Sequence, residues 1–333
     1  MKRLSLILVL LGAMALVGGF LKPVETYRAE TLAFWPEKEG PPATFAVDEE
    51  GRVVVVPRTG DRLFKLLPGR GRWQEVPLTT SGKISPWVAD LVADGAGGFF
   101  AVDQGGSLLW SISPDGKAIP YFEASAQGEK RLIQGVAVDG KGQAYLDLVR
   151  LLPAAYAREI VRLEENPKES TVVARVILDE EGWHWDPEGD PAPSGTLSLA
   201  PSGHLFFLEP RETDMSLLIR VLNPGKALGT IRVDSVERLG RAEVVGTDAK
   251  GHVYVGLNLG TPEGTLLKVS RDGKARWVLP LPMDPGGPFL RRYAQVDGRG
   301  NLYVMRPSEK GFEILFYRLV KSYQWRWTER KGP

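Results

Sequence analysis

Residues 294–304 read Ala-Gln-Val-Asp-Gly-Arg-Gly-Asn-Leu-Tyr-Val, two short apolar segments joined by a turn that contains Asp297 and Gly300. An Asp side chain at this place can accept hydrogen bonds from the backbone amides that follow, and Gly tolerates a positive φ. Tyr303 lies three residues after the glycine, where a half-buried strand favours an aromatic or β-branched residue. The stretch therefore predicts a tight β-hairpin.

The same pattern occurs six times along the chain. The copies span residues 45–55, 91–101, 136–146, 197–207, 245–255 and 294–304. Their shared glycines, at positions 51, 97, 142, 203, 251 and 300, are separated by 46, 45, 61, 48 and 49 residues. The residue three positions after each glycine is expected in the core: Val54, Phe100, Tyr145, Phe206, Tyr254 and Tyr303. A repeat of this length, with one insertion in its third interval, predicts a β-propeller.

Further strands complete each repeat. Third strands that end in a second turn are expected at 108–117, 217–226 and 266–274, and a short fourth strand at 276–279. The fold class is therefore all-β, a six-bladed β-propeller of four-stranded blades preceded by one N-terminal hydrophobic helix. The expected blade cores lie near residues 45–76, 91–122, 135–175, 196–232, 244–280 and 293–328.

Two segments could complete the last blade. Thr26–Trp35 and Tyr323–Thr328 both alternate in the manner of a strand. We favour the N-terminal segment, because it would tie the membrane-proximal end of the chain into the ring.

The repeat resembles the NHL-repeat propellers within the wider TolB-like six-bladed group. The resemblance is carried by the Val-Asp-x-x-Gly-x-x-Tyr-Val core at 296–304 and by the Asp-Gly-Lys turn at 272–274. It covers roughly residues 40–320, and the fourth copy departs from it with Ala200 in place of Asp. The resemblance implies a fold that is used by receptors, scaffolds, lactonases and lyases alike, so it does not identify an activity.

The N-terminus has the features of a targeting segment. Lys2 and Arg3 precede an uncharged stretch, Leu4–Leu21, that as a helix would be roughly 27 Å long. An uncleaved anchor is favoured over a signal peptide, although Ala13-Met14-Ala15 resembles a cleavage site. We therefore expect a signal anchor or signal peptide at 1–22. The propeller at 23–333 would lie outside the cytoplasm, tethered to the cell membrane by the N-terminal helix or secreted after cleavage.

Composition limits the partners. The chain has 42 Lys and Arg against 41 Asp and Glu, so no basic field would attract nucleic acid. Cysteine is absent, which rules out disulfides, thiolate catalysis and lipoprotein acylation. The expected partners are a protein or a small polar ligand, and the membrane through the N-terminal helix alone.

The fold resemblance implies that ligands bind at the channel face, where the innermost strands begin and where the 147–158 loop also lies. The candidate ligand-binding residues are Trp87, Asp90, Gln134, Arg241, Glu243, Arg291 and Arg292. The arginines could hold a polar or anionic ligand through paired hydrogen bonds. Asp90, Gln134 and Glu243 offer oxygen ligands of the kind that calcium prefers. No cofactor is expected, with calcium as the alternative.

The insertion between the third and fourth repeats contains a possible partner loop, formed by Trp183, His184 and Trp185 among several acidic residues. Two tryptophans beside carboxylates could form an aromatic platform for a sugar, a cation or a partner chain. The other two histidines, His204 and His252, directly follow a turn glycine and are expected to be exposed turn residues.

No motif for nucleophilic catalysis, metalloprotease chemistry or phosphate binding occurs in the chain. The favoured hypothesis is an extracytoplasmic propeller that acts as a ligand- or protein-binding scaffold and not as an enzyme. The alternative is a metal-dependent hydrolase or lyase of the lactonase type. A third hypothesis makes the propeller the soluble arm of an envelope assembly.

Overall fold

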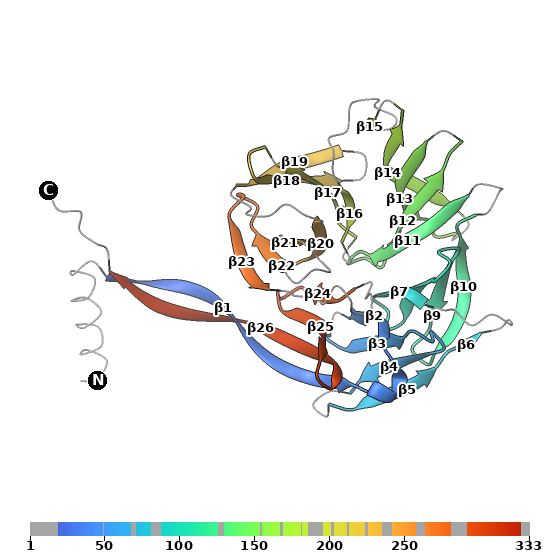
Figure 1. Cartoon of the computed structure of the whole chain (residues 1–333), viewed down its shortest axis with the longest axis horizontal. Coiled ribbons are helices and arrows are strands. Elements are labelled where there is room, and N and C mark those ends of the chain that lie inside the picture. The colour runs from blue at the N-terminus through green and yellow to red at the C-terminus, as the bar shows by residue number, and fades with distance from the viewer. Residues whose placement is uncertain are drawn as a thin grey trace.

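The computed structural model describes residues 19–48, 50–67, 71–80, 88–125, 130–153, 155–166, 169–180, 182–185, 196–200, 203–211, 213–223, 226–234, 242–257, 264–280 and 292–327. Within these ranges the chain forms six sheets arranged as blades around a centre (Figure 1). Their strands are antiparallel except for one short parallel pairing at the edge of a single blade. The predicted six-bladed propeller is therefore confirmed. Within the same ranges, the only helix is the short 3-10 turn η1 (Glu37–Glu39), and no helix is long and apolar enough to cross a membrane.

The first three blades follow the order of the chain. Blade 1 contains β2 (Pro42–Val47), β3 (Val53–Pro57), β4 (Arg62–Leu66) and β5 (Trp73–Pro77). Blade 2 contains β7 (Val88–Ala93), β8 (Phe99–Asp103), β9 (Leu108–Ile112) and β10 (Lys117–Glu123). Blade 3 contains β11 (Arg131–Val138), β12 (Ala144–Leu151), β13 (Tyr156–Leu163) and β14 (Ser170–Asp179). A fifth outer strand adds to the four expected ones in two blades, as β6 (Thr79–Thr80) in blade 2 and β15 (Gly182–Trp185) in blade 3.

The other three blades complete the ring. Blade 4 contains β16 (Thr196–Leu199), β17 (Leu205–Arg211), β18 (Ser216–Asn223) and β19 (Lys226–Val233). Blade 5 contains β20 (Ala242–Thr247), β21 (Val253–Leu257), β22 (Thr265–Val269) and β23 (Ala275–Pro280). Blade 6 contains β24 (Ala294–Val296), β25 (Leu302–Ser308), β26 (Gly311–Trp327) and, as its outermost strand, β1 (Gly19–Trp35).

The N-terminal strand closes the ring, as the sequence favours. β1 pairs with β26 along its whole length, from Gly19 opposite Trp327 to Trp35 opposite Phe312. The two strands form a long ribbon that extends beyond the disc (Figure 1). The C-terminal residues 323–327 thus pair with residues 19–23 at the far end of this ribbon.

Only the last three residues of the expected helix over Leu4–Leu21 lie within the part of the chain that the structure describes. Residues 1–18 lie outside the described part of the chain, whereas Gly19–Leu21 belong to β1 and not to a helix. The strand therefore begins inside the apolar stretch, because these residues find a hydrogen-bonding partner in β26.

The hairpin turns have the predicted chemistry. In five copies the Asp Oδ1 accepts the amides of the residues two and four positions later, as for Asp94 with Ala96 (2.8 Å) and Gly98 (2.9 Å). The glycine that follows has a positive φ in all six copies. In the fourth copy, Ala200 retains the backbone bond from Gly203 at 2.9 Å without a side-chain acceptor.

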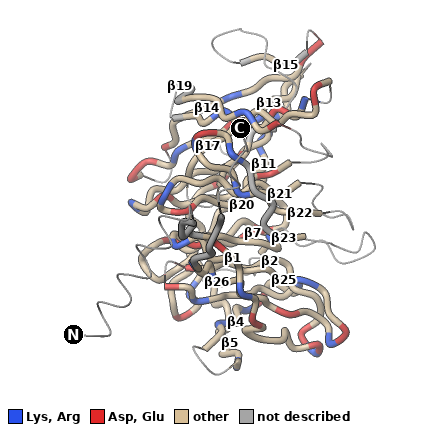
Figure 2. The backbone as a smooth tube through the Cα atoms, turned by 90° about the vertical axis from the view of Figure 1, so that its left-hand side faces the viewer, with Lys and Arg blue, Asp and Glu red and all other residues tan. Residues whose placement is uncertain are grey.

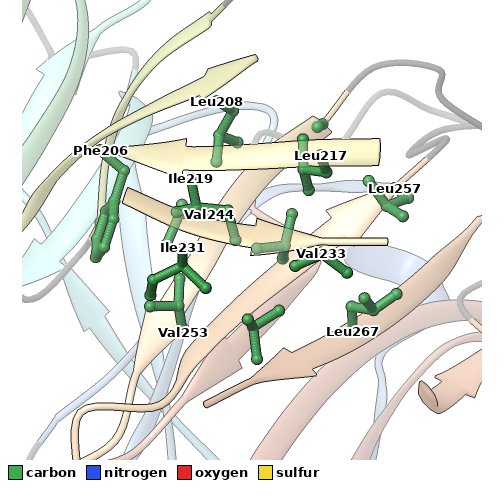
Figure 3. Packing of buried hydrophobic residues seen from close by; sticks show 14 residues of the cluster. Phe206, Leu208, Leu217, Ile219, Ile231, Val233, Val244, Val253, Leu257 and Leu267 are labelled. Carbon is green, nitrogen blue, oxygen red and sulfur yellow. The ribbon is translucent and has the colours of Figure 1, made fainter. Parts of the chain in front are cut away.

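The core consists of six apolar layers, each between two consecutive blades. Figure 3 shows the layer between blades 4 and 5, where Leu208, Leu217 and Ile219 face Val244 and Leu257. The six repeat residues expected in the core are all buried. Because each blade is packed on both faces, the ring holds together without disulfides.

Candidate functional site

Among the residues that the structure describes, Arg292 joins blade 6 to the inner strands of two other blades. Arg292 precedes the innermost strand of blade 6, and its Nε and Nη2 donate to the two oxygens of Asp90 in β7, the second at 2.7 Å. Nη2 also donates to the carbonyl oxygen of Val136 in β11 at 2.5 Å. In a ring of six blades, blade 6 lies opposite blade 3 (Figure 1). The hydrogen bonds of Arg292 thus join the start of blade 6 to the inner strands of blades 2 and 3.

Asp90 is 1% exposed and accepts four hydrogen bonds. Besides the two from Arg292, Oδ1 accepts the Leu91 amide at 3.0 Å and Oδ2 accepts the Val136 amide at 3.2 Å. A carboxylate offers about four lone-pair sites, so these donors use its full accepting capacity. Asp90 therefore does not fit the role of a calcium ligand that the sequence suggested for it, because a guanidinium group already neutralises its charge.

A second arginine–carboxylate pair lies in blade 3. Arg158 donates to Asp147 through Nε (3.0 Å) and Nη2 (2.6 Å), and the aspartate is 6% exposed. The sequence places both residues in a loop of the channel face, whereas the structure places them on β12 and β13. Their relevance to a site could not be recognised from spacing, because Asp147 and Arg158 meet only through strand pairing.

Glu243 links the two pairs electrostatically. Burial opposes the charged form of Arg292 most strongly, but the charge and hydrogen bonds of Asp90, with a contribution from Glu243, raise the pKa of Arg292. Burial likewise opposes the charge of Arg158, and Asp147, with help from Tyr156 and Glu243, raises the pKa of Arg158. Both guanidinium groups thus stay charged at any physiological pH, which suits them to binding and not to proton transfer.

The structure brings together three of the seven predicted channel residues, namely Asp90, Arg292 and Glu243. Gln134 is half-buried at a register irregularity between Ile133 and Gly135 in β11. Trp87, Arg241 and Arg291 lie outside the described residues.

Two buried polar residues that the sequence did not single out join neighbouring inner strands. Gln295 in β24 donates to the Phe45 carbonyl oxygen at 2.5 Å and accepts the Val47 amide at 3.0 Å, across the seam between blades 6 and 1. Ser198 Oγ accepts the Val244 amide at 3.1 Å between blades 4 and 5. Both occupy the position two residues before the turn Asp or its Ala200 counterpart, which is a usable sequence signal for this role.

The predicted partner loop is a strand for part of its length. Residues 182–185 form β15, and Trp183 and Trp185 take backbone register opposite Leu178 and Val176 of β14. His184 Nδ1 lies 3.6 Å from Asp179 Oδ2. The predicted loop is thus the outer edge of blade 3, away from the channel.

The three histidines are not on the inner strands that carry Asp90 and Glu243: His184 is on β15, and His204 and His252 are in hairpin turns. His204 is exposed, as predicted, but His252 is half-buried with Nδ1 only 2.7 Å from Asp248 Oδ2, which corrects the expectation of an exposed turn residue. Among the described residues, no group of three or more His, Asp or Glu could hold a metal ion. The charged groups described at the channel are paired arginines and carboxylates.

In the view of Figure 2, Lys and Arg segments are interspersed with Asp and Glu segments over the described backbone. This agrees with the net charge of +1 for the whole chain.

Comparison with known proteins supports the fold. No protein-family model matches the chain, and no curated protein shows significant similarity to it. Among solved structures, a streptogramin B lyase (TM-score 0.54, 13% identity) is covered to 98% by 88% of this chain. A gluconolactonase from Xanthomonas campestris (TM-score 0.54, 14% identity) is covered to 90% by 88% of this chain. The calcium-binding protein regucalcin from Agrobacterium tumefaciens (TM-score 0.51, 12% identity) is covered to 95% by 89% of it. At these identities the similarity establishes the propeller fold alone.

Proposed function

We propose that this chain is a non-catalytic binding propeller of the NHL-repeat, TolB-like class. The observation that carries the proposal is the fourfold hydrogen bonding of Asp90, which receives the Arg292 guanidinium from blade 6. Because hydrogen bonds use all the acceptor sites of Asp90, this carboxylate stabilises the ring and has no open position for a catalytic metal. Ligands would then bind on the exposed faces of the blades.

The proposal includes a location outside the cytoplasm. Its support is the sequence of residues 1–22, with Lys2 and Arg3 ahead of the apolar stretch. Cleavage after Ala15 would leave β1 intact, because the strand begins at Gly19. A tethered and a secreted form could therefore have the same closed ring. Fractionation of cells that express the full chain, with N-terminal sequencing of the product, tests the location; recovery in the cytoplasm would refute it.

Calcium titration tests the absence of a metal centre. The melting temperature of the full chain should be the same in calcium and in chelator, and no lactone of a test panel should be hydrolysed. Asp90→Asn serves as the channel variant and Asp272→Asn, at an exposed turn, as the matched control. Calcium-dependent lactone hydrolysis that is lost only in Asp90→Asn would overturn the proposal.

The alternative is a hydrolase or lyase of the lactonase type. It is supported by the reported activities of the structural neighbours, among them a streptogramin B lyase and a gluconolactonase. The channel geometry speaks against the metal-dependent version, since it places a guanidinium on the carboxylate. A metal-independent lyase would be revealed by turnover that persists in chelator and in Asp90→Asn.

A further inference from the structure

The outer end of the β1–β26 ribbon consists of two strands alone. β25 pairs with β26 only as far as Tyr317, so from Arg318 to Trp327 the only partner of β26 among the described strands is β1. We call residues 19–24 and 322–327 the ribbon tip; their six residue pairs extend over roughly 20 Å, beyond the disc (Figure 1). A two-stranded ribbon by itself is only marginally stable in water, so packing on a further surface would stabilise the tip.

The base of the ribbon is fixed to the ring. Glu25 Oε2 accepts a hydrogen bond from Lys268 Nζ in β22 at 2.9 Å, and Lys268 is 6% exposed. The hydroxyl of Tyr27 lies 3.2 Å from that of Tyr254 in β21 and donates to the Gly300 carbonyl oxygen at 3.1 Å. These contacts with blades 5 and 6 set the direction in which the ribbon tip leaves the ring.

The strand register divides the ribbon tip into two different faces. Residues directly opposite each other share a face, and successive residues of a strand alternate between faces. One face therefore contains Gly19, Leu21, Pro23, Tyr323, Trp325 and Trp327. The other face contains Phe20, Lys22, Val24, Ser322, Gln324 and Arg326. The first face, which we call the aromatic face, has no charged residue, whereas the second has two basic residues.

The register also places two tryptophans at the level where the uncharged N-terminal stretch ends. Trp327 is opposite Gly19, and Trp325 is opposite Leu21, the last residue of that stretch. Trp and Tyr are enriched at membrane–water interfaces, where an amphipathic ring is favoured. With residues 4–18 in a membrane, both tryptophan positions would therefore be at the surface of the bilayer.

We propose that the ribbon tip lies in the interfacial region of an anionic bilayer, with its aromatic face toward the lipid. Lys22 and Arg326 are the charged residues of the tip, and both favour negatively charged headgroups. The C-terminal strand thus adds a second membrane contact to the one expected from the N-terminal segment. The contacts of Glu25 and Tyr27 would then hold the propeller in one orientation on the membrane. This membrane contact rests on the tethered form of the proposed function.

Quenching of tryptophan fluorescence by brominated lipid tests the contact. The full chain is reconstituted in vesicles of equal parts of phosphatidylcholine and phosphatidylglycerol, with and without bromine on the upper acyl chain. The loss of fluorescence caused by bromine should fall by at least about half in Trp325→Phe/Trp327→Phe, because these two residues are placed at the interface. The matched control is Trp183→Phe/Trp185→Phe, which removes two tryptophans at the same spacing from β15 and should leave the quenching unchanged.

Single cysteines give a second measurement, since the chain contains no cysteine. A spin label is attached to Trp325→Cys or to Gln324→Cys in the same vesicles, and its collisions with lipid-soluble oxygen and with a water-soluble nickel chelate are compared. The ratio of oxygen to nickel collisions should be at least about twofold higher at position 325, because neighbouring residues of a strand lie on opposite faces. Arg318→Cys, on the same strand at a side chain that is 61% exposed, should give the low ratio of a position in water.

Three results would overturn the inference: no quenching of the unmodified chain, equal loss of quenching in the two double variants, or equal collision ratios at positions 324 and 325. Absent quenching with mutual broadening of the spin labels at position 325 would overturn it in favour of a second copy of the chain on the aromatic face. Recovery of the chain from the cytoplasm would refute the proposed location without changing the vesicle measurements. Absent quenching in a chain that fractionates with membranes would refute the ribbon contact alone.

Discussion

The Arg292–Asp90 pair allows a quantitative test of the channel. In Arg292→Met, Asp90 keeps the Leu91 and Val136 amides but loses the guanidinium group that neutralises its charge. Breaking a buried ion pair from one side costs about 3–5 kcal/mol. That is a large share of the roughly 5–15 kcal/mol that stabilises a typical domain, so the loss should be easy to measure.

The double variant Arg292→Met/Asp90→Asn removes the unpaired charge and leaves an amide oxygen for the backbone donors. We expect it to be more stable than Arg292→Met alone by at least about 1 kcal/mol, whereas Asp90→Asn alone should destabilise the chain. The difference between these two effects of Asp90→Asn measures the coupling between the two side chains. Urea unfolding followed by tryptophan fluorescence measures the free energies of unfolding of the unmodified chain, of Arg292→Met, of Asp90→Asn and of the double variant. Arg318→Met, whose side chain is 61% exposed, is the control and should change stability by less than about 0.5 kcal/mol.

Two outcomes would refute this reasoning. One is a cost of less than about 1 kcal/mol for Arg292→Met, which would mean that the pair contributes little to the fold. The other is additivity of the two single variants within about 0.5 kcal/mol, which would mean that the side chains do not interact.

Three further predictions concern the turns, the closing strand and acid stability. Asp94→Ala should cost about 1–2 kcal/mol and Asp94→Asn much less, since Asn keeps an acceptor for the Ala96 and Gly98 amides; equal costs in urea unfolding would contradict the turn model. Trp35→Ala should cost about 3–5 kcal/mol, because this 1% exposed ring packs edge-on against Phe64 and Trp73; an unchanged unfolding midpoint would show that β1 does not close blade 6. Burial raises the pKa values of Glu25 and Asp248, but Lys268, which lies 2.9 Å from Glu25, and His252 beside Asp248 lower both overall, below 4.5 and 3.8. Their stabilisation is present above those ordinary pKa values and is lost as the pH falls below them and through the lowered native pKa values, so Lys268→Met should reduce stability near pH 7 and flatten its decline below about pH 5. An unaltered pH profile in the variant would contradict this.

The hairpins and the number of blades could be predicted from short stretches of the sequence. Asp297 and Gly300 act within their own turn, and in every repeat a buried residue such as Tyr303 lies three positions after the glycine. The turns and the buried positions can therefore be predicted from spacing alone. The closing strand could be favoured but not decided from the sequence, because Thr26–Trp35 and Tyr323–Thr328 both alternate. Pairing of β1 with β26 settles it and uses both segments in one ribbon.

The contacts between charged side chains could not be predicted from the sequence and are seen only in the tertiary structure. Asp90 and Arg292 are 202 residues apart, and Lys268 and Glu25 are 243 apart, so sequence spacing gives no indication that they meet. Asp90 could be predicted as a channel residue from its strand, but whether it faced a metal, solvent or a guanidinium depended on which side chain reaches it from another blade. In the same way, four different strands, β11 to β14, carry Arg131, Arg150, Glu159 and Arg175. Only the pairing of these strands in one sheet brings the four charges together. Local chemistry thus determined the blades of this protein, whereas ring closure determined which charges meet.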